Sequence, residues 1–123
     1  MSLVWVNRLM VAVGIFFFGG GAVFHGLALI WPHLSEPMPP LTHATFVVVN
    51  VFFAVAFVMR VKWVQWPFLV LTGQQVWSHG GDIVRGREEH PPVWDVQSLF
   101  ALGGIALIWL LLWARRRATA GSP

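Results

Sequence analysis

Residues 41–59 read LTHATFVVVNVFFAVAFVM and contain no Asp, Glu, Lys or Arg. A helix that crosses a bilayer needs about 20 predominantly apolar residues, and this stretch has the right length and composition. Comparable apolar stretches cover residues 9–31, 63–80 and 95–113. Together the four stretches predict an all-α integral membrane protein. We expect a single domain over residues 1–123, built as a bundle of four transmembrane helices.

The composition supports placing the chain in a membrane. Hydrophobic residues make up 57% of the sequence and charged residues only 11%, whereas a soluble domain has about 25% charged residues. The eight Trp residues stand near the ends of the apolar stretches. Trp is typical of the layer between hydrocarbon and headgroups, so these residues mark the two faces of the bilayer. The first stretch runs on to Trp31, which favours a retained helix over a cleaved signal sequence.

The positions of Arg and Lys predict the orientation, because these residues favour the cytoplasmic side of a membrane. With the N-terminus inside, only Arg85 and Arg87 lie outside. The inside residues are Arg8, Arg60, Lys62, Arg115, Arg116 and Arg117. We therefore expect a multi-pass protein of a bacterial inner (plasma) membrane with both termini cytoplasmic. The short turn at residues 60–62 predicts that the second and third spans form a tight antiparallel hairpin.

The two halves of the sequence share a weak pattern. His25-Gly26 and His79-Gly80 lie 54 positions apart, and the pairs at residues 39–40 and 91–92, both Pro-Pro, lie 52 apart. At the latter spacing His43 corresponds to Asp95. Because both halves run in the same direction, the pattern is consistent with a parallel repeat of two helices.

Polar residues inside the apolar stretches are the candidates for function, since burying them in hydrocarbon is costly. Helical spacing places Thr72, Gln75, His79 and Asp82 on one face of the third span. We expect a polar pocket in the outer half of the bundle. Its predicted lining residues are His25, His43, Asn50, Gln75, His79, Asp82 and Asp95. The alternative interpretation is that these side chains form hydrogen bonds between helices and hold the bundle together.

His25 is the strongest single candidate, because it lies six residues before Trp31 and so about 9 Å inside the outer interface. Small residues surround it in sequence. The run Gly19 to Gly21 and the pair Ala22 and Gly26 predict close contact with a neighbouring helix.

Several function classes are excluded. The sequence has no Cys, which removes disulfides, Cys-held iron–sulfur clusters and thiolate chemistry. Nucleic-acid binding is excluded because the basic residues act as topology signals and no basic surface with stacking aromatics remains. No strong catalytic motif is present, so a role other than catalysis is favoured, although an enzyme stays open.

Four functions remain. The leading one is an accessory or interaction subunit, which would contact the lipid bilayer and a larger membrane-protein complex or further copies of itself. The second is electron transfer with haem b or quinone, in which His25 and His79 would bind the cofactor. The third is binding or transport of a small molecule in the outer pocket. The fourth is a metal site built from His25, His43, His79 and Asp95. The sequence does not identify the cofactor.

Overall fold

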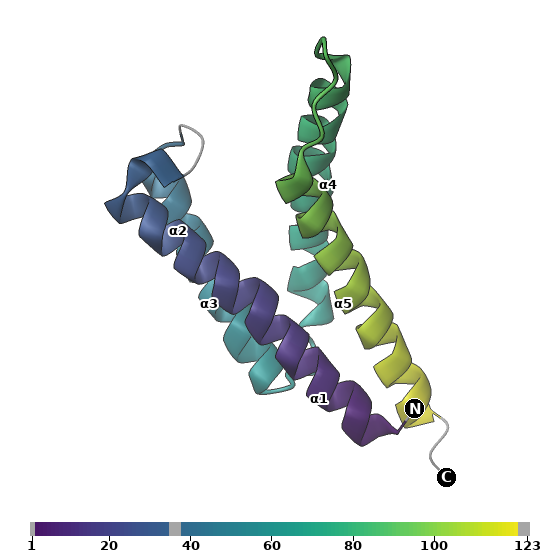
Figure 1. Cartoon of the computed structure of the whole chain (residues 1–123). Coiled ribbons are helices and arrows are strands. Elements are labelled where there is room, and N and C mark those ends of the chain that lie inside the picture. The colour runs from purple at the N-terminus through teal and green to yellow at the C-terminus, as the bar shows by residue number, and fades with distance from the viewer. Residues whose placement is uncertain (1, 35–37, 121–123) are drawn as a thin grey trace. The chain divides into compact units, whose positions relative to one another are not determined.

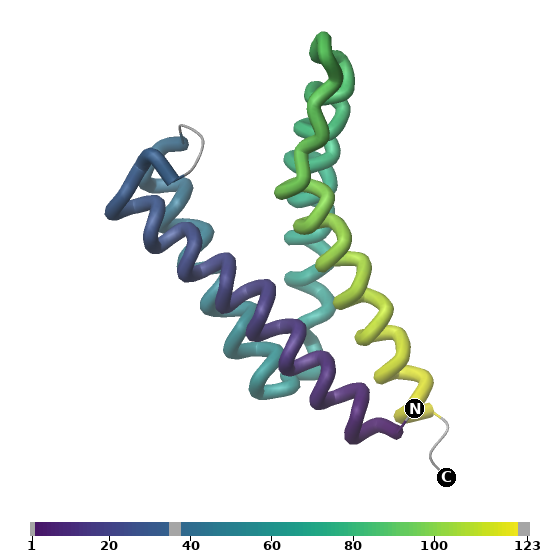
Figure 2. The backbone as a smooth tube through the Cα atoms, viewed as in Figure 1, coloured from purple at the N-terminus to yellow at the C-terminus, as the bar shows by residue number. Residues whose placement is uncertain are grey.

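The computed structural model describes residues 2–34 and 38–120. Every regular element in these residues is a helix, as the sequence predicts (Figures 1 and 2). In chain order these are α1 (Leu3–Gly14), the π-helical turn η1 (Ile15–Gly19), α2 (Gly20–Ile30), the 3-10 turn η2 (Pro32–Leu34), α3 (Pro40–Val58), α4 (Gln65–Glu88) and α5 (Val96–Ala120).

Within the described residues, three helices are long and apolar enough to cross a membrane. They are Leu3–Ile30, which joins α1, η1 and α2 into one helix of 28 residues, then Pro40–Val58 and Val96–Ala120. This supports a multi-pass membrane protein. The fourth expected span corresponds to α4, which is long enough at 24 residues but more polar than the other three.

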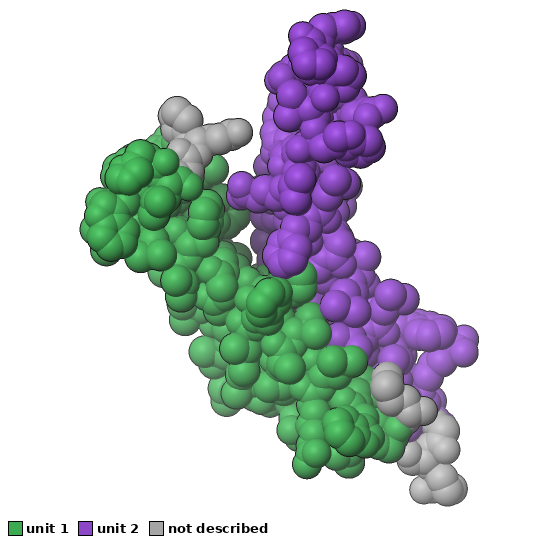
Figure 3. Space-filling model, in the orientation of Figure 1, with its two compact units in different colours: residues 1–64 green, residues 65–123 purple. Residues whose placement is uncertain are grey.

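The chain divides into two compact units, residues 1–64 and residues 65–123 (Figure 3). Unit 1 holds α1, η1, α2, η2 and α3, and unit 2 holds α4 and α5. Each unit is a helical hairpin whose two arms pack against each other along their length.

Unit 1 is built as a ladder of small residues facing larger ones. A methyl group added at Gly14 would lie 2.8 Å from Cβ of Phe57, and one added at Gly21 would lie 2.7 Å from Oδ1 of Asn50. Continuing by seven residues along each helix leads to Ala28 and His43, both buried. This seven-residue spacing on both helices is typical of antiparallel helices that cross at a shallow angle.

Aromatic rings fill the space between the first two contacts of this ladder. Phe18 stacks on Phe53 and on Phe57, with ring centroids 5.1 and 5.6 Å apart. All three rings are buried. The close helix contact thus involves Gly14 and Gly21, whereas a methyl group at Gly26 would meet nothing within 4 Å. The expectation of close packing was right for Gly21 and wrong for Gly26.

Unit 2 is held together by side-chain hydrogen bonds at three levels. Arg116 donates to Gln65 at one end. Trp109 Nε1 donates to Thr72 Oγ1 at 2.9 Å in the middle. His79 Nδ1 and Ser98 Oγ lie 2.8 Å apart toward the other end. As the α4 partner advances in sequence the α5 partner recedes, so α4 and α5 are antiparallel over most of their length.

The third helix departs from the expected bounds. Gly80-Gly81 was expected to end it, yet α4 continues to Glu88. Glycine in a helix costs only about 1 kcal/mol relative to alanine, so two glycines do not by themselves stop one. An ion pair between Asp82 and Arg85, three residues apart, stabilises the added turns.

The end of α3 is well defined by its hydrogen bonds. The Val61 amide donates to the Ala56 carbonyl at 3.0 Å and the Arg60 amide donates to the Phe57 carbonyl at 3.1 Å. Arg60 has a φ of 54°, in the left-handed region. This is the Schellman arrangement, which satisfies the last carbonyls of a helix and turns the chain sharply.

Candidate functional site

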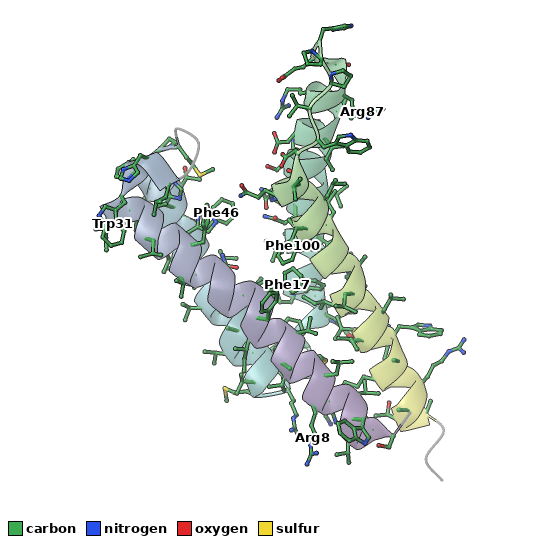
Figure 4. The ribbon with its side chains drawn as sticks, viewed as in Figure 1. Arg8, Phe17, Trp31, Phe46, Arg87 and Phe100 are labelled. Atoms are coloured by element: carbon green, nitrogen blue, oxygen red, sulfur yellow. The ribbon has the colours of Figure 1, made fainter. Side chains whose placement is uncertain are left out.

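Two histidines of unit 1 contact each other. His25 on α2 and His43 on α3 place their Nδ1 atoms 2.9 Å apart. One of these nitrogens must carry the proton and the other must accept it. The His25 ring also stacks on Phe46, with centroids 4.9 Å apart, and Figure 4 labels Phe46 on its helix. His43 is only 4% exposed and His25 is half-buried, so the pair is a part-buried polar contact at one end of the unit 1 ladder.

Asn50, the third polar residue expected in unit 1, acts as a packing residue. Its side-chain nitrogen donates to the Phe46 carbonyl at 2.8 Å. Its amide group lies against Gly21, where no side chain intervenes. The bond to Phe46 lies within α3, and the contact with Gly21 fits close packing between two helices, which is the alternative interpretation given above.

In unit 2, a chain of hydrogen bonds runs from Asp95 through Ser98 to His79. The Ser98 hydroxyl donates to Asp95 Oδ2 at 2.6 Å. A carboxylate only accepts, so the hydroxyl proton points toward Asp95, and His79 Nδ1 must donate to Ser98 Oγ at 2.8 Å. In the neutral ring the other nitrogen, Nε2, then carries a lone pair. The chain therefore fixes the tautomer of His79.

Asp95 also begins helix α5. Its Oδ1 accepts the Ser98 backbone amide at 2.9 Å, which is the bond of a helix N-cap. The two hydrogen bonds from Ser98 hold the pKa of the Asp95 carboxyl below its ordinary value. The carboxylate is therefore ionised at neutral pH and accepts both hydrogen bonds from Ser98. The Ser98 hydroxyl in turn accepts from His79.

Asp82 lies on the same helix as His79 and has two neighbours. It forms an ion pair with Arg85, and its Oδ2 lies 3.9 Å from His79 Nδ1. Arg87, two residues after Arg85 on α4, places its guanidinium 4.4 Å from the centre of the Trp94 ring. Figure 4 labels Arg87 near this end of α4. This end of unit 2 thus combines charge with an interfacial Trp, as expected of a helix end at headgroup level.

Gln75 does not join the contacts with α5. Its side-chain nitrogen donates to Gln74 Oε1 at 2.7 Å. Gln74 is exposed, as is Trp77, at 86%. α4 therefore carries an exposed amide, Gln74, near its midpoint on the side opposite Thr72, whereas Gln75 lies on the side of Thr72 and His79 and is half-buried.

A cavity of about 380 Å³ lies at the closed end of the unit 1 ladder. It is lined by Ala28, Leu29, Pro32, Met38, Pro39, Pro40 and His43. Among these described lining residues, His43 is the one imidazole and none carries a charge. Trp31, labelled in Figure 4, follows the last residue of α2 and marks the membrane interface near this cavity.

The predicted pocket residues thus fall into two groups. His25, His43 and Asn50 belong to unit 1. Gln75, His79, Asp82 and Asp95 belong to unit 2. Within the described parts of the chain, no three His, Asp or Glu residues are grouped to hold a metal ion. His25 and His79 use their Nδ1 atoms for contacts within their own units. Their pairing at one cofactor stays a prediction.

Sequence reasoning missed two features of the sites. His25 and His43 were expected to line one pocket, but the direct hydrogen bond between their rings was not predicted. The cavity beside His43 was also missed; its described walls come from α2, η2, the start of α3 and the residues Met38 and Pro39 before it.

Comparison with protein-family models, with curated proteins and with solved structures gives no match to this chain.

Proposed function

We propose that the protein is a small integral membrane interaction subunit, which assembles with other membrane helices through the face of α4 that carries Gln74. The observation that carries this proposal is the exposed amide of Gln74 near the midpoint of the helix. Gln74 and Gln75 bond to each other and to no other side chain in the described part of unit 2.

The cost of exposing amides to lipid supports this proposal. A side-chain amide offers two donors and one acceptor with two lone pairs, so one mutual bond leaves most of this capacity unused. An unsatisfied polar group in hydrocarbon costs several kcal/mol. A neighbouring helix with its own polar side chains removes this cost and holds the assembly together. The face of α4 that carries Gln74 is therefore suited to a protein neighbour.

We propose four spans with both termini in the cytoplasm of a bacterial cell, and the antiparallel pairing in unit 2 supports the count. From Val96 to Trp113, α5 extends about 26 Å at 1.5 Å per residue, close to the thickness of the hydrocarbon core. Because α4 bonds to α5 at three levels, it enters the bilayer beside α5 despite its lower hydropathy. Arg117 lies 4.1 Å from the centre of the Trp113 ring, a suitable anchor at the inner interface.

The test is native gel electrophoresis of membranes solubilised in a mild detergent. We expect the wild type to migrate in an assembly larger than one chain. Replacing both amides (Gln74→Leu with Gln75→Leu) removes the polar contacts while making α4 more compatible with lipid, so the assembly should dissociate and the protein should stay folded. Val76→Leu is the control, since Val76 is exposed at 52% about 160° around the same helix. A double variant that keeps the wild-type assembly would contradict the proposal.

Haem binding by His25 and His79 is a second candidate, and the fixed tautomer of His79 favours it. Histidines that bind metals generally donate their other ring nitrogen to a carboxylate, a carbonyl or a water, which orients the ring. His79 donates from Nδ1 to Ser98, which is bound to Asp95. Its Nε2 is left as the nitrogen that would bind iron, and the Nδ1 contact of His25 leaves the same atom there.

A reduced-minus-oxidised visible spectrum of the gently purified protein tests this candidate. Sharp bands of a haem with two axial histidines, lost in His25→Ala and in His79→Ala but kept in His33→Ala, would support it. Bands that survive both of the first two substitutions would contradict it. The tautomer can be checked without haem from the ¹⁵N chemical shifts of His79, which Ser98→Ala should change.

A further inference from the structure

Four exposed side chains form a stripe along one face of α4. They are Trp66, Val70, Gln74 and Trp77, and we call this face the α4 stripe. At 100° per residue, these four side chains lie within about 80° of one another around the helix axis. Thr72, which accepts a hydrogen bond from α5, lies about 160° from Gln74. The α4 stripe therefore points away from the partner helix within unit 2.

Two residues of the α4 stripe lie deep in the membrane if α4 crosses it as proposed above. Gln65 marks one end of the helix, where it bonds to Arg116. Gln74 follows about 13 Å further along the axis and Trp77 about 18 Å further, both inside a hydrocarbon core of about 30 Å. Trp77 is 86% exposed yet too deep for an anchor at headgroup level. An exposed amide and an exposed indole thus lie one turn apart within the hydrocarbon, which favours a protein neighbour over lipid.

A second copy of the chain is the one neighbour that must carry an amide at the depth of Gln74. Two copies inserted in the same direction can pair about a two-fold axis normal to the membrane, so that each residue lies at the same depth in both. A side-chain amide both donates and accepts, so two Gln74 amides can form two reciprocal hydrogen bonds. The bond from Gln75 occupies only one lone pair of Gln74 Oε1, and the remaining capacity of the amide suits this contact.

Charge and area also suit the pairing of two identical stripes. Residues 65–81 contain no Asp, Glu, Lys or Arg, so bringing the two faces together opposes no like charges. Trp66 is 65% exposed and Val70 is 76% exposed. Since a Trp buries about 150–250 Å², the exposed parts of Trp66 and Trp77 offer roughly 230–380 Å² on each copy. With Val70 and Gln74, the stripe is large enough for a small specific interface, which buries less than about 1,200 Å² over both partners.

We propose that the partner bound by the α4 stripe is a second copy of this chain. The two copies form a parallel dimer in which the Gln74 amides bond to each other and the Trp77 rings pack beside them. The proposal rests on the assembly role of α4 given above, and it names the occupant of that face.

The experiment is disulfide crosslinking of single-cysteine variants of the full chain in native membranes. The sequence has no Cys, so one substitution introduces the only thiol of the chain, and a disulfide between two differently tagged copies reports their contact. Val70→Cys and Gly81→Cys place the thiol on the face of the α4 stripe, whereas Val76→Cys, the control, places it about 120° away from Val70. On oxidation, we expect a band of twice the chain mass from the first two variants and little from Val76→Cys.

Two further substitutions in the Val70→Cys background measure what holds the copies together. The purified chain is reconstituted at rising lipid-to-protein ratios, and the dilution at which the dimer band falls to half is compared. Gln74→Leu should weaken the dimer about threefold to tenfold, the effect of interhelical hydrogen bonds. Trp77→Ala should weaken it about tenfold or more, as removal of a central Trp does at other interfaces. Trp113→Ala is the control, since it removes an exposed Trp of α5 instead and should leave the dimer unchanged. Equal dilution points for all three would contradict pairing through the α4 stripe.

A benzophenone amino acid at position 74 separates failure of self-pairing from failure of assembly. If it links to a different protein while Val70→Cys and Gly81→Cys give no dimer band, the assembly role stands and the pairing of two copies is refuted. If it links only to lipid or to residues 1–64 of the same chain, both are refuted. A band from Val76→Cys as strong as that from Val70→Cys would indicate random collision and would also overturn the proposal. All variants are compared at the wild-type circular dichroism spectrum, and Gly81→Cys decides if Val70→Cys does not fold.

Discussion

Replacing Gly14 by alanine tests the packing of unit 1 most sharply. The new methyl group would lie 2.8 Å from Cβ and 3.0 Å from Cγ of Phe57. Cβ of Phe57 is attached directly to the backbone of α3, so the contact is relieved only if the helices move apart. Such overpacking costs about 1–3 kcal/mol, and the better helix propensity of alanine returns up to about 1 kcal/mol. We expect a net loss of about 1–2 kcal/mol in the free energy of unfolding.

Gly20→Ala is the matched control, since a methyl group there meets nothing within 4 Å. We expect it to stabilise the protein by up to about 1 kcal/mol. Both values can be measured by titrating SDS into mixed micelles while following energy transfer between dyes on the two arms of the hairpin. Equal effects of Gly14→Ala and Gly20→Ala would refute the close contact between α1 and α3 and, with it, the ladder of unit 1.

Two further predictions concern unit 2. Thr72→Val removes the acceptor for Trp109 and should lower the free energy of unfolding by about 0.6 kcal/mol; Thr45→Val, which loses only a bond to its own helix, should have a smaller effect in the same SDS titration. The hydrogen bonds from Ser98 lower the pKa of Asp95 in the folded protein. The stability that they contribute is therefore complete above the unfolded-state pKa of about 4. It is lost as the pH falls through the lower folded-state pKa. Asp95→Ala should cost about 1 kcal/mol at pH 7 through loss of the helix cap and should flatten the pH dependence of stability below pH 4; an unchanged acid-induced decline would contradict this assignment.

The helical class and most helix bounds could be predicted from the sequence, because hydropathy and helix length report directly on the cost of burying a backbone in lipid. The second stretch, residues 41–59, matches α3 at Pro40–Val58, and the fourth, residues 95–113, starts one residue before α5. However, α5 continues to Ala120, seven residues past the expected end, and the first helix begins at Leu3, six residues before the expected start. The continuation of α4 past Gly80 was not predictable from a rule that treats paired glycines as helix breakers. The exposed pair of Asp82 with Arg85 adds about 0.2–0.5 kcal/mol to these turns.

The candidate site was predictable in composition and less so in its contacts. The polar residues inside the spans could be recognised from the sequence as candidates. Which of them meet depends on how each helix is rotated about its axis, and a rotation of one residue, 100°, exchanges one neighbour for another. This is why the direct hydrogen bond between His25 and His43 was not predicted. The spacing of seven residues predicts that Thr72 and His79 share one helix face, and the structure shows that this face meets α5.

The central claim is that the face of α4 that carries Gln74 contacts another membrane protein, and a photocrosslinker placed at position 74 in living cells tests it most directly. A benzophenone amino acid at position 74 should yield a crosslinked product of discrete, larger mass, and the same group at position 76 should yield lipid adducts or none. Two differently tagged copies would identify a second copy of the chain as the partner. Crosslinks from position 74 only to residues 1–64 of the same chain, or only to lipid, would contradict the claim.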